Sequence, residues 1–210
     1  MAFYAHKILA SLASLATAGR MPLVRVSAVR GSVTLAATDG RGATVVRLPV
    51  EVPWSGSYLF LAKDALAAGK FAGSKGFVSF DLPGTIEAHS SLGCTNPLRV
   101  NCDASTVFPP MDRVIPAAYS GHGNGHFDAD LLAQFLAIHA TACNGQGKRD
   151  VPQVQIDLGE ALNPCRIASR SRDGAEALSV VMPMRSTVDA SDVYASVMAA
   201  FTGQLSEAAE

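Results

Sequence analysis

Cysteine and histidine are the residue types that most often bind metals or act as nucleophiles, and in this chain their spacing is irregular. No C-x-x-C pair occurs, and no histidine lies at a zinc-finger spacing from a cysteine. His89 and Cys94 would form a thiol dyad only if the fold brought them together. We therefore predict no metal ion or other cofactor, and reduced, half-buried thiols at Cys94, Cys102, Cys143 and Cys165.

The motifs of the common enzyme classes are also missing. The sequence has no glycine-rich nucleotide loop, no G-x-S-x-G elbow, no H-E-x-x-H and no pattern of paired carboxylates. Catalysis needs reactive groups that are held in a defined arrangement, and these patterns are how such arrangements usually appear in a sequence. We predict that the protein is not an enzyme.

The segment LSVVMPMRS, residues 178–186, offers another kind of chemistry. A strand-like run ends at Pro183, which stands between Met182 and Met184. Methionine is unbranched and polarizable, so it suits an apolar surface that adapts to different ligands, and proline fixes the backbone beside it. These residues indicate either ordinary core packing or a place where another molecule docks.

Composition and charge limit the elements that position these residues. The chain has 210 residues and a hydrophobic fraction of 49%, enough for one large or two small domains with a core. Its 17 basic and 18 acidic residues nearly cancel, so the net charge demands no polyanionic partner. Residues 1–20 favour a helix of the folded domain over a signal peptide, and no run reaches the ~18 apolar residues of a membrane span. We expect a cytoplasmic protein with no membrane partner.

A pattern of one helix followed by three strands recurs along the chain. Apolar residues at helical spacing predict a helix over 5–18 that ends at Gly19, and a second helix over 63–71 follows a strand at 57–62. A third helix follows Asp128 or Asp130, either of which can cap it. The predicted strands after these helices cover 22–29, 32–39 and 43–52, then GFVSFDL, TIEAHS and PLRVNC, then PQVQIDL, CRIAS and ALSVVM.

These units predict an α+β fold built from about three β-α-β-β-β units. Each unit alone leaves one sheet face and one helix face bare, so the units must pack against each other. The proline-rich and then glycine-rich stretch at 103–125 predicts a boundary near residue 117. We predict a two-unit domain at 1–116, a one-unit partial domain at 117–185 and a helical tail at 186–210.

Three stretches of the chain together resemble the bacterial DNA polymerase III beta subunit, the sliding clamp. They are LAATDGRGATV (35–45), FPPMDRVIP (108–116) and SVVMPMR (179–185), and they occur in the same order in that family. The resemblance covers roughly residues 1–185 and includes the repeated unit, which is that family's half-domain. It implies the DNA-clamp fold, in which outer sheets surround inner helices that line a hole for duplex DNA.

The resemblance also implies a cleft where the three stretches converge, which in that family receives short linear motifs of DNA polymerases, clamp loaders and repair proteins. Arginines at its rim would bind peptide carbonyls or carboxylates. For the Thr-Asp-Gly step the simpler interpretation is a plain turn with positive φ at the glycine. Carried over position by position, the predicted cleft consists of Leu23, Thr38, Gly40, Arg41, Pro109, Arg113, Val114, Val180, Met182, Pro183, Met184 and Arg185.

The resemblance implies duplex DNA as a partner that is bound without regard to sequence. A thinly basic lining suits a ring that slides, because tight phosphate contacts would oppose sliding, but it equally fits helix faces that are merely solvated. The basic residues on or near the expected inner helices are Lys7, Arg20, Lys63, Lys70, Lys148 and Arg149.

The chain differs from the family in length and in its tail. Family members have three domains of two units, and a lone third unit would leave a sheet edge and an apolar face uncovered. We therefore expect self-association, with two copies pairing through their third units and two such dimers forming a tetrameric ring. The tail at 186–210 could cover the cleft or form the self-association contact. Its GQLSE resembles the start of the family's clamp-binding peptide, glutamine-leucine-serine or -aspartate, but lacks the apolar residues that follow.

The predicted function is that of a sliding-clamp-like processivity factor for DNA replication or repair, which encircles DNA as a homo-oligomeric ring and tethers its partners through the cleft. The alternative is a clamp-derived adaptor or inhibitor that binds clamp partners without encircling DNA. The oligomeric state separates the two hypotheses.

Overall fold

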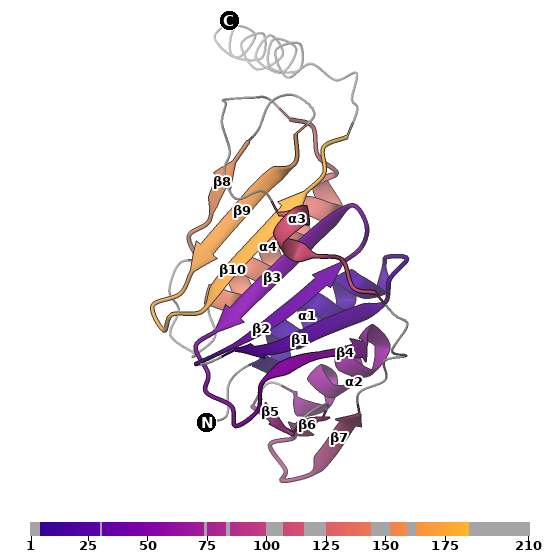
Figure 1. The fold of residues 1–210 in the computed structure, drawn as a ribbon, viewed down its shortest axis with the longest axis vertical. Helices are drawn as coiled ribbons and strands as arrows, with labels where there is room; N and C mark the ends of the chain where they lie inside the picture. The colour runs from indigo at the N-terminus through magenta and orange to yellow at the C-terminus, as the bar shows by residue number, and fades with distance from the viewer. Residues whose placement is uncertain are drawn as a thin grey trace, which may run out of the picture.

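The computed structural model describes residues 5–29, 31–73, 75–82, 85–99, 107–115, 125–143, 152–158 and 163–184. These residues form an α+β fold in which all paired strands are antiparallel. Among these residues, a large sheet has the helices α1 (Ala5–Thr17) and α4 (Ala129–Cys143) on one face and one short helix, α3 (Met111–Val114), on the other (Figure 1). A small sheet lies beside it, and the helix α2 (Ala62–Ala72) packs against α1 and this small sheet. We call the face of the large sheet that α1 and α4 cover the inner face, and the opposite face the outer face.

The large sheet has seven strands, and its centre joins two distant parts of the sequence. Strand β3 pairs with β10, so that Ala43 lies opposite Val180 and Arg47 lies opposite Glu176. The predicted boundary near residue 117 therefore separates strands that share one sheet. In spatial order the strands are β4 (Gly56–Leu61), β1 (Leu23–Val29), β2 (Ser32–Thr38), β3 (Gly42–Leu48), β10 (Glu176–Val181), β9 (Cys165–Arg170) and β8 (Gln155–Asp157).

The small sheet has three strands in the order β5 (Phe77–Leu82), β6 (Thr85–His89) and β7 (Thr95–Arg99). The side chain of Trp54, which precedes β4, donates a hydrogen bond of 2.6 Å from Nε1 to the backbone oxygen of Phe80. This bond ties the loop between β3 and β4 of the large sheet to the small sheet.

The three longer helices are α1 (Ala5–Thr17), α2 (Ala62–Ala72) and α4 (Ala129–Cys143). Helix α1 buries Leu9, Leu12 and Leu15, which share one side of a 3.6-residue period. Helices α1 and α2 approach closely because Gly69 has no side chain: a Cβ there would lie 2.6 Å from the Cβ of Ala10. The short helix α3 (Met111–Val114) lies on the outer face (Figure 1).

The main core fills the space between the inner face and the three longer helices. Side chains on a strand alternate between faces, and the inward positions are apolar: Val24 and Val26 on β1, Val46 on β3 and Ile167 on β9 are at most 1% exposed. Burial of each such side chain contributes roughly 1.5 to 3 kcal/mol to folding.

One polar network interrupts this core. On α4, His139 lies 2.7 Å from Ser169 Oγ through Nδ1 and 2.8 Å from Ser179 Oγ through Nε2. The Ser179 hydroxyl also lies 2.7 Å from Thr44 Oγ1, so the network crosses the β3–β10 seam. Burial lowers the pKa of His139 to about 4, which keeps the imidazole neutral, with one nitrogen donating and the other accepting.

The predicted repeat is complete in only one place within the described residues. The element order runs α1, β1 to β3, then β4, α2, β5 to β7, then α4, β8 to β10, so only the second group has a strand before its helix. In the third group a single bridge between His126 and Met184 takes that place. The predicted helical tail at 186–210 lies outside the described residues.

The reactive residues of the sequence are dispersed through this fold. Cys143 and Cys165 are buried, Cys94 is exposed, all three are free thiols, and Cys102 lies outside the described residues. Burial raises the pKa of Cys165 to about 11. His89 stacks on Phe77 and lies 3.0 Å from Ser79 Oγ, so its ring contacts β5. Across the described ranges no three His, Cys, Asp or Glu residues gather as metal ligands, and no helix is long and apolar enough to span a membrane.

Candidate functional site

The turn between β2 and β3 is held by its own side chains. Thr38 donates a 2.6 Å hydrogen bond from Oγ1 to the backbone oxygen of Gly42, and Asp39 Oδ1 accepts from the backbone N–H groups of Arg41 and Gly42, both at 2.8 Å. Gly40 has φ of +88°, a conformation that favours glycine. The Thr-Asp-Gly step is thus a turn with positive φ at the glycine, and its part in a cleft stays a prediction.

Arg41 connects this turn to two other segments. Its Nη1 lies 3.3 Å from Asp128 Oδ2, and its backbone oxygen accepts a 2.9 Å hydrogen bond from Met182 N–H. Asp128 caps α4 by accepting from Leu131 N–H at 3.0 Å. That hydrogen bond and the nearby Arg41 lower the pKa of Asp128, so the carboxylate stays charged.

The end of β10 lies beside the same turn, because Val181 pairs with Gly42. Beyond it the backbone N–H of Met184 donates to the oxygen of His126 at 2.7 Å. The side chains of Met182 and Met184 are 49% and 51% exposed. The two methionines that follow β10 are therefore exposed to solvent and do not fill the core. Arg185 lies outside the described residues.

Helix α3 brings the second predicted segment onto the outer face. Met111 and Ile115 pack on Ala36, Ala43 and Val180, and this packing leaves Val180 only 1% exposed. Of the predicted cleft residues on this segment, Pro109 is half-buried, and Arg113 and Val114 are exposed.

A cation–π contact extends this packing to β1, where the guanidinium of Arg25 lies 4.9 Å from the ring centroid of Phe108. Leu23, two residues before Arg25 on the same face of β1, is 7% exposed.

The three predicted segments therefore meet at one part of the outer face. We call this the motif corner; it consists of residues 38–42, residues 107–115 and residues 180–184. Only part of it is accessible, since Val180 and Thr38 are buried while Arg41, Val114 and both methionines are exposed. The buried members support the corner, and the exposed members form its surface.

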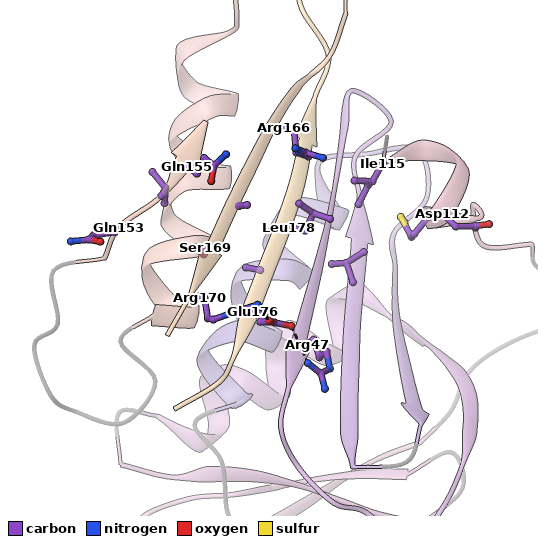
Figure 2. Close-up of a pocket in the computed structure, with 15 residues that line it drawn as sticks. Arg47, Asp112, Ile115, Gln153, Gln155, Arg166, Ser169, Arg170, Glu176 and Leu178 are labelled. Atoms are coloured by element: carbon purple, nitrogen blue, oxygen red, sulfur yellow. Dashed lines mark hydrogen bonds and ion pairs between the residues drawn. The ribbon is translucent and has the colours of Figure 1, made fainter. Parts of the chain in front are cut away.

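A hollow of about 920 Å³ opens beside α3 on the outer face, and none of its lining residues was predicted (Figure 2). We call it the outer groove. Strands β3, β10 and β9 supply its floor, Met111 and Ile115 form one wall, and residues 153–155 form the other (Figure 2). The floor residues alternate with core residues along each strand, but only the pairing of β3 with β10 brings them together.

The outer groove combines an apolar floor with a charged cluster. Glu176 accepts from Arg47 Nη1 at 3.0 Å and from Arg170 Nη2 at 2.5 Å, and the Arg47 hydrogen bond is the main cause that lowers the pKa of Glu176 (Figure 2). Arg166 binds Asp157 through Nε at 2.9 Å and through Nη2 at 2.6 Å. Three arginines therefore border a surface whose floor includes Val45 and Leu178.

The predicted DNA-facing residues lie on or next to helices α1 and α2, or outside the described residues. Lys7 on α1 and Lys63 and Lys70 on α2 are exposed, as is Arg20 just after α1. Helix α4 carries no lysine or arginine. Lys148 and Arg149 lie outside the described residues.

Comparisons with known proteins identify the fold. No protein-family model matches the chain, and no curated protein matches it. The A. fulgidus PCNA that was solved with the C-terminal region of FEN-1 superposes with a TM-score of 0.58 at 13% identity, over 87% of this chain and 97% of that one.

Bacterial clamps give similar values. The DNA polymerase sliding clamp of Pseudomonas aeruginosa has a TM-score of 0.56 at 15% identity, over 89% of this chain and 66% of that one. The clamp of Bacillus subtilis has a TM-score of 0.57 at 10% identity, over 86% of this chain and 63% of that one. The chain thus spans a little under two thirds of the bacterial clamps, and its fold resembles that of DNA sliding clamps.

Proposed function

We propose that this protein is a sliding-clamp-like processivity factor, which assembles into a ring around duplex DNA and tethers short linear motifs of a DNA polymerase, clamp loader or repair protein at the motif corner. One observation carries the proposal. In a fold that resembles sliding clamps, three segments distant in sequence meet beside two exposed methionines, Met182 and Met184. The matched clamps are not enzymes, and the proposed role involves no catalysis.

The chemistry of the motif corner suits exchangeable peptide binding. Methionine side chains adapt to differently shaped apolar residues, and Pro183 limits the backbone freedom between them. The segment is held in place by the hydrogen bonds of Met182 to Arg41 and of Met184 to His126, so binding requires little ordering. Burial of one leucine or phenylalanine of a partner would contribute roughly 1.5 to 3 kcal/mol. A few such contacts give micromolar affinity.

An open sheet edge supports the assembly step. Among the described residues, strand β8 is the edge strand of the large sheet and has only three residues. Around it Val154, Ile156 and Leu158 occupy alternate positions, and all three are exposed. An edge with unpaired backbone groups and apolar side chains is a template for pairing with another chain. We propose that two copies pair here about a two-fold axis, and that two such dimers close the ring.

Retention on DNA tests the ring. The protein is loaded on nicked circular duplex DNA and passed through a sizing column, before and after the circle is cut with a restriction enzyme. We expect an oligomer by light scattering at micromolar concentration and release when the DNA becomes linear, because a ring slides off free ends. A stable monomer would contradict the proposal.

A second measurement tests the motif corner separately. A labelled synthetic peptide that begins Gln-Leu-Asp and continues with two apolar residues is titrated by fluorescence anisotropy. We expect Met184→Ala to weaken binding about tenfold, because apolar contact area is lost. The matched control is Leu92→Ala, which truncates another exposed apolar residue (88% exposed) in the turn between β6 and β7 and should leave the affinity unchanged. If wild type and Met184→Ala bind the peptide with equal affinity, the motif corner is not the binding site.

The adaptor hypothesis has one observation in its favour. Helix α4 presents no basic residue on the side where duplex DNA would pass, and the basic residues of α1 and α2 are three lysines. A compact dimer that binds the peptide but is not retained on circular DNA would select the adaptor.

A further inference from the structure

The outer groove adjoins the motif corner. The two share Met111 and Ile115, which cover Val180 on the corner side, while the floor of the groove continues along β10 to Leu178 and Glu176. The two surfaces therefore share a wall but present different side chains. The motif corner is mainly apolar, whereas the outer groove joins an apolar floor to a cluster of arginines (Figure 2).

Two arginines of the outer groove share one carboxylate. Arg47 and Arg170 both bind Glu176, and their side chains remain 52% and 76% exposed. The other charged groups are arranged apart from this pair: Arg166 binds Asp157, and Asp112 lies on the α3 side of the groove (Figure 2). A guanidinium has five N–H donors in a planar fork, so each arginine keeps donors that can bind a further carboxylate. A fitting ligand would therefore place carboxylates over this pair and apolar side chains over Leu178 and Val45.

A segment of this chain has that chemistry. Residues 186–210 contain no lysine or arginine, and their acidic residues are Asp189, Asp192, Glu207 and Glu210. Leu205 lies two residues before the first of the glutamates and Phe201 lies further upstream, so apolar and acidic side chains are interspersed. The segment complements both the floor and the charge of the groove.

The connection to β10 makes this contact easy to form. The segment begins directly after Arg185. Leu178, on the floor of the groove, lies six residues before Met184, a distance of roughly 20 Å along an extended chain. An extended chain of this length reaches up to about 80 Å, so the span is not limiting. A tether of this kind gives an effective concentration of about millimolar, so weak contacts suffice to occupy the groove.

We propose that the segment 186–210 docks in the outer groove of its own chain, with its carboxylates on Arg47 and Arg170 and its apolar side chains on the floor at Leu178. The docked segment closes the groove to other acidic, apolar peptides and releases it when such a ligand competes. This inference does not depend on ring formation or on DNA, so it stands or falls separately from the proposed function.

The test uses the full chain and a free peptide. A fluorescein-labelled peptide of residues 196–210 is titrated by anisotropy into wild type and into a chain whose own segment is disabled by Leu205→Ser, Glu207→Lys and Glu210→Lys. We expect the disabled chain to bind the free peptide at least about tenfold more tightly, because the tethered segment no longer competes. Equal affinities would overturn the proposal, since the groove of the wild type would then be empty.

Charge reversal locates the contact. In the disabled chain, Arg47→Glu with Arg170→Glu should weaken binding of the free peptide at least about tenfold, because the rim of the groove now repels carboxylates. The matched control, Arg20→Glu with Lys63→Glu, changes the net charge equally on the helix side and should leave the affinity within about twofold. A loss of equal size in both variants would overturn the assignment to the groove.

A charge swap rules out misfolding as the cause of the loss. A peptide that carries Glu207→Lys and Glu210→Lys should bind the Arg47→Glu, Arg170→Glu chain better than the native peptide does, and should bind less well as salt is added. If the swapped peptide fails to bind while circular dichroism shows a folded chain, the arginines are not the carboxylate contacts and the proposal is wrong.

Discussion

The two faces of the seven-stranded sheet are made by the same strands but differ in almost every property. The inner face is covered by α1 and α4, and its apolar side chains are nearly all inaccessible. Of the described residues, α3 covers the centre of the outer face, whose strands carry Arg25, Arg47, Arg166 and Arg170. The inner face therefore supplies stability, and the outer face offers surfaces for recognition.

Each face also contains a small region with the character of the other. The inner face holds the network of His139, Ser169, Ser179 and Thr44, and the outer face holds the apolar cluster under Met111. The inner network links β3, β10, β9 and α4 across the β3–β10 seam. The outer cluster holds α3 where the motif corner and the outer groove adjoin.

The largest expected effect tests the inner face as the source of stability. Phe135 on α4 is fully buried and would contact any side chain at Gly42. We expect Phe135→Ala to lower the free energy of unfolding by about 3 to 5 kcal/mol, because it leaves a cavity. The matched variant Leu178→Ala on the outer face should cost about 1 kcal/mol or less, since that side chain is half-buried. Urea denaturation measures the unfolding free energy of both variants. Equal losses would contradict the inference that the inner face is the main source of stability.

The second prediction concerns pH and the inner network. The folded-state pKa of His139 is about 4, below the ordinary value of 6.5, so the unfolded chain binds a proton more readily in this range. The resulting stability is fully present above about pH 6.5 and is lost as the pH falls toward about 4, by up to about 3 kcal/mol.

The variant His139→Gln isolates this effect. Glutamine keeps one donor and one acceptor but does not titrate, so unfolding free energies of this variant should vary less between pH 7 and pH 5 than those of wild type. The pKa of His6 is also lowered by burial, so its contribution to the pH dependence of the unfolding free energy remains in both proteins. Parallel pH profiles would show that His139 does not carry the dependence.

The third prediction tests how tightly the seam is packed. An added Cβ at Gly42 would lie 2.5 Å from the Phe135 ring and 2.7 Å from the backbone oxygen of Val180. We expect Gly42→Ala to destabilise the protein by about 1 to 3 kcal/mol, because α4 and β10 must shift. Ser57→Ala, an exposed position on β4, serves as the control and should change the melting temperature little. An unchanged melting temperature for Gly42→Ala would show that the seam is loose.

The smallest expected effect belongs to the outer face. Replacing Glu176 by glutamine removes the shared carboxylate of Arg47 and Arg170, whose side chains are largely exposed. Because solvent screens such pairs, Glu176→Gln should change the free energy of unfolding by less than about 1 kcal/mol. The same variant should strengthen binding of the acidic peptide 196–210 to the chain with a disabled segment. A large loss of stability would mean that the outer face is structural after all.

Much of the local structure was predictable because it depends on neighbouring residues. The helices expected at 5–18 and 63–71 occur as Ala5–Thr17 and Ala62–Ala72, and Asp128 caps α4 as one of two candidates. The outer groove was not predictable, since its floor residues read as the ordinary exposed positions of three separate strands.

The cleft residues that were predicted by resemblance have a mixed outcome. The structure brings their three segments together, but the accessibility of each member depended on packing that no motif reveals. Val180 is covered by Met111 and Ile115, and the Thr38 hydroxyl is used within its own turn. Whether the exposed members bind a peptide stays a prediction.

The sequence by itself determined the helices, the alternation of the strands, the cap at Asp128 and the turn at Gly40, because each arises from interactions within a few residues. The tertiary structure alone decided that β3 pairs with β10, and hence that Arg47 meets Glu176 and that α3 lies across the seam. Such pairings join residues more than a hundred positions apart, and many pairs of strands with the same alternation could form them. Only the combined fit of the inner core and its polar network selects one.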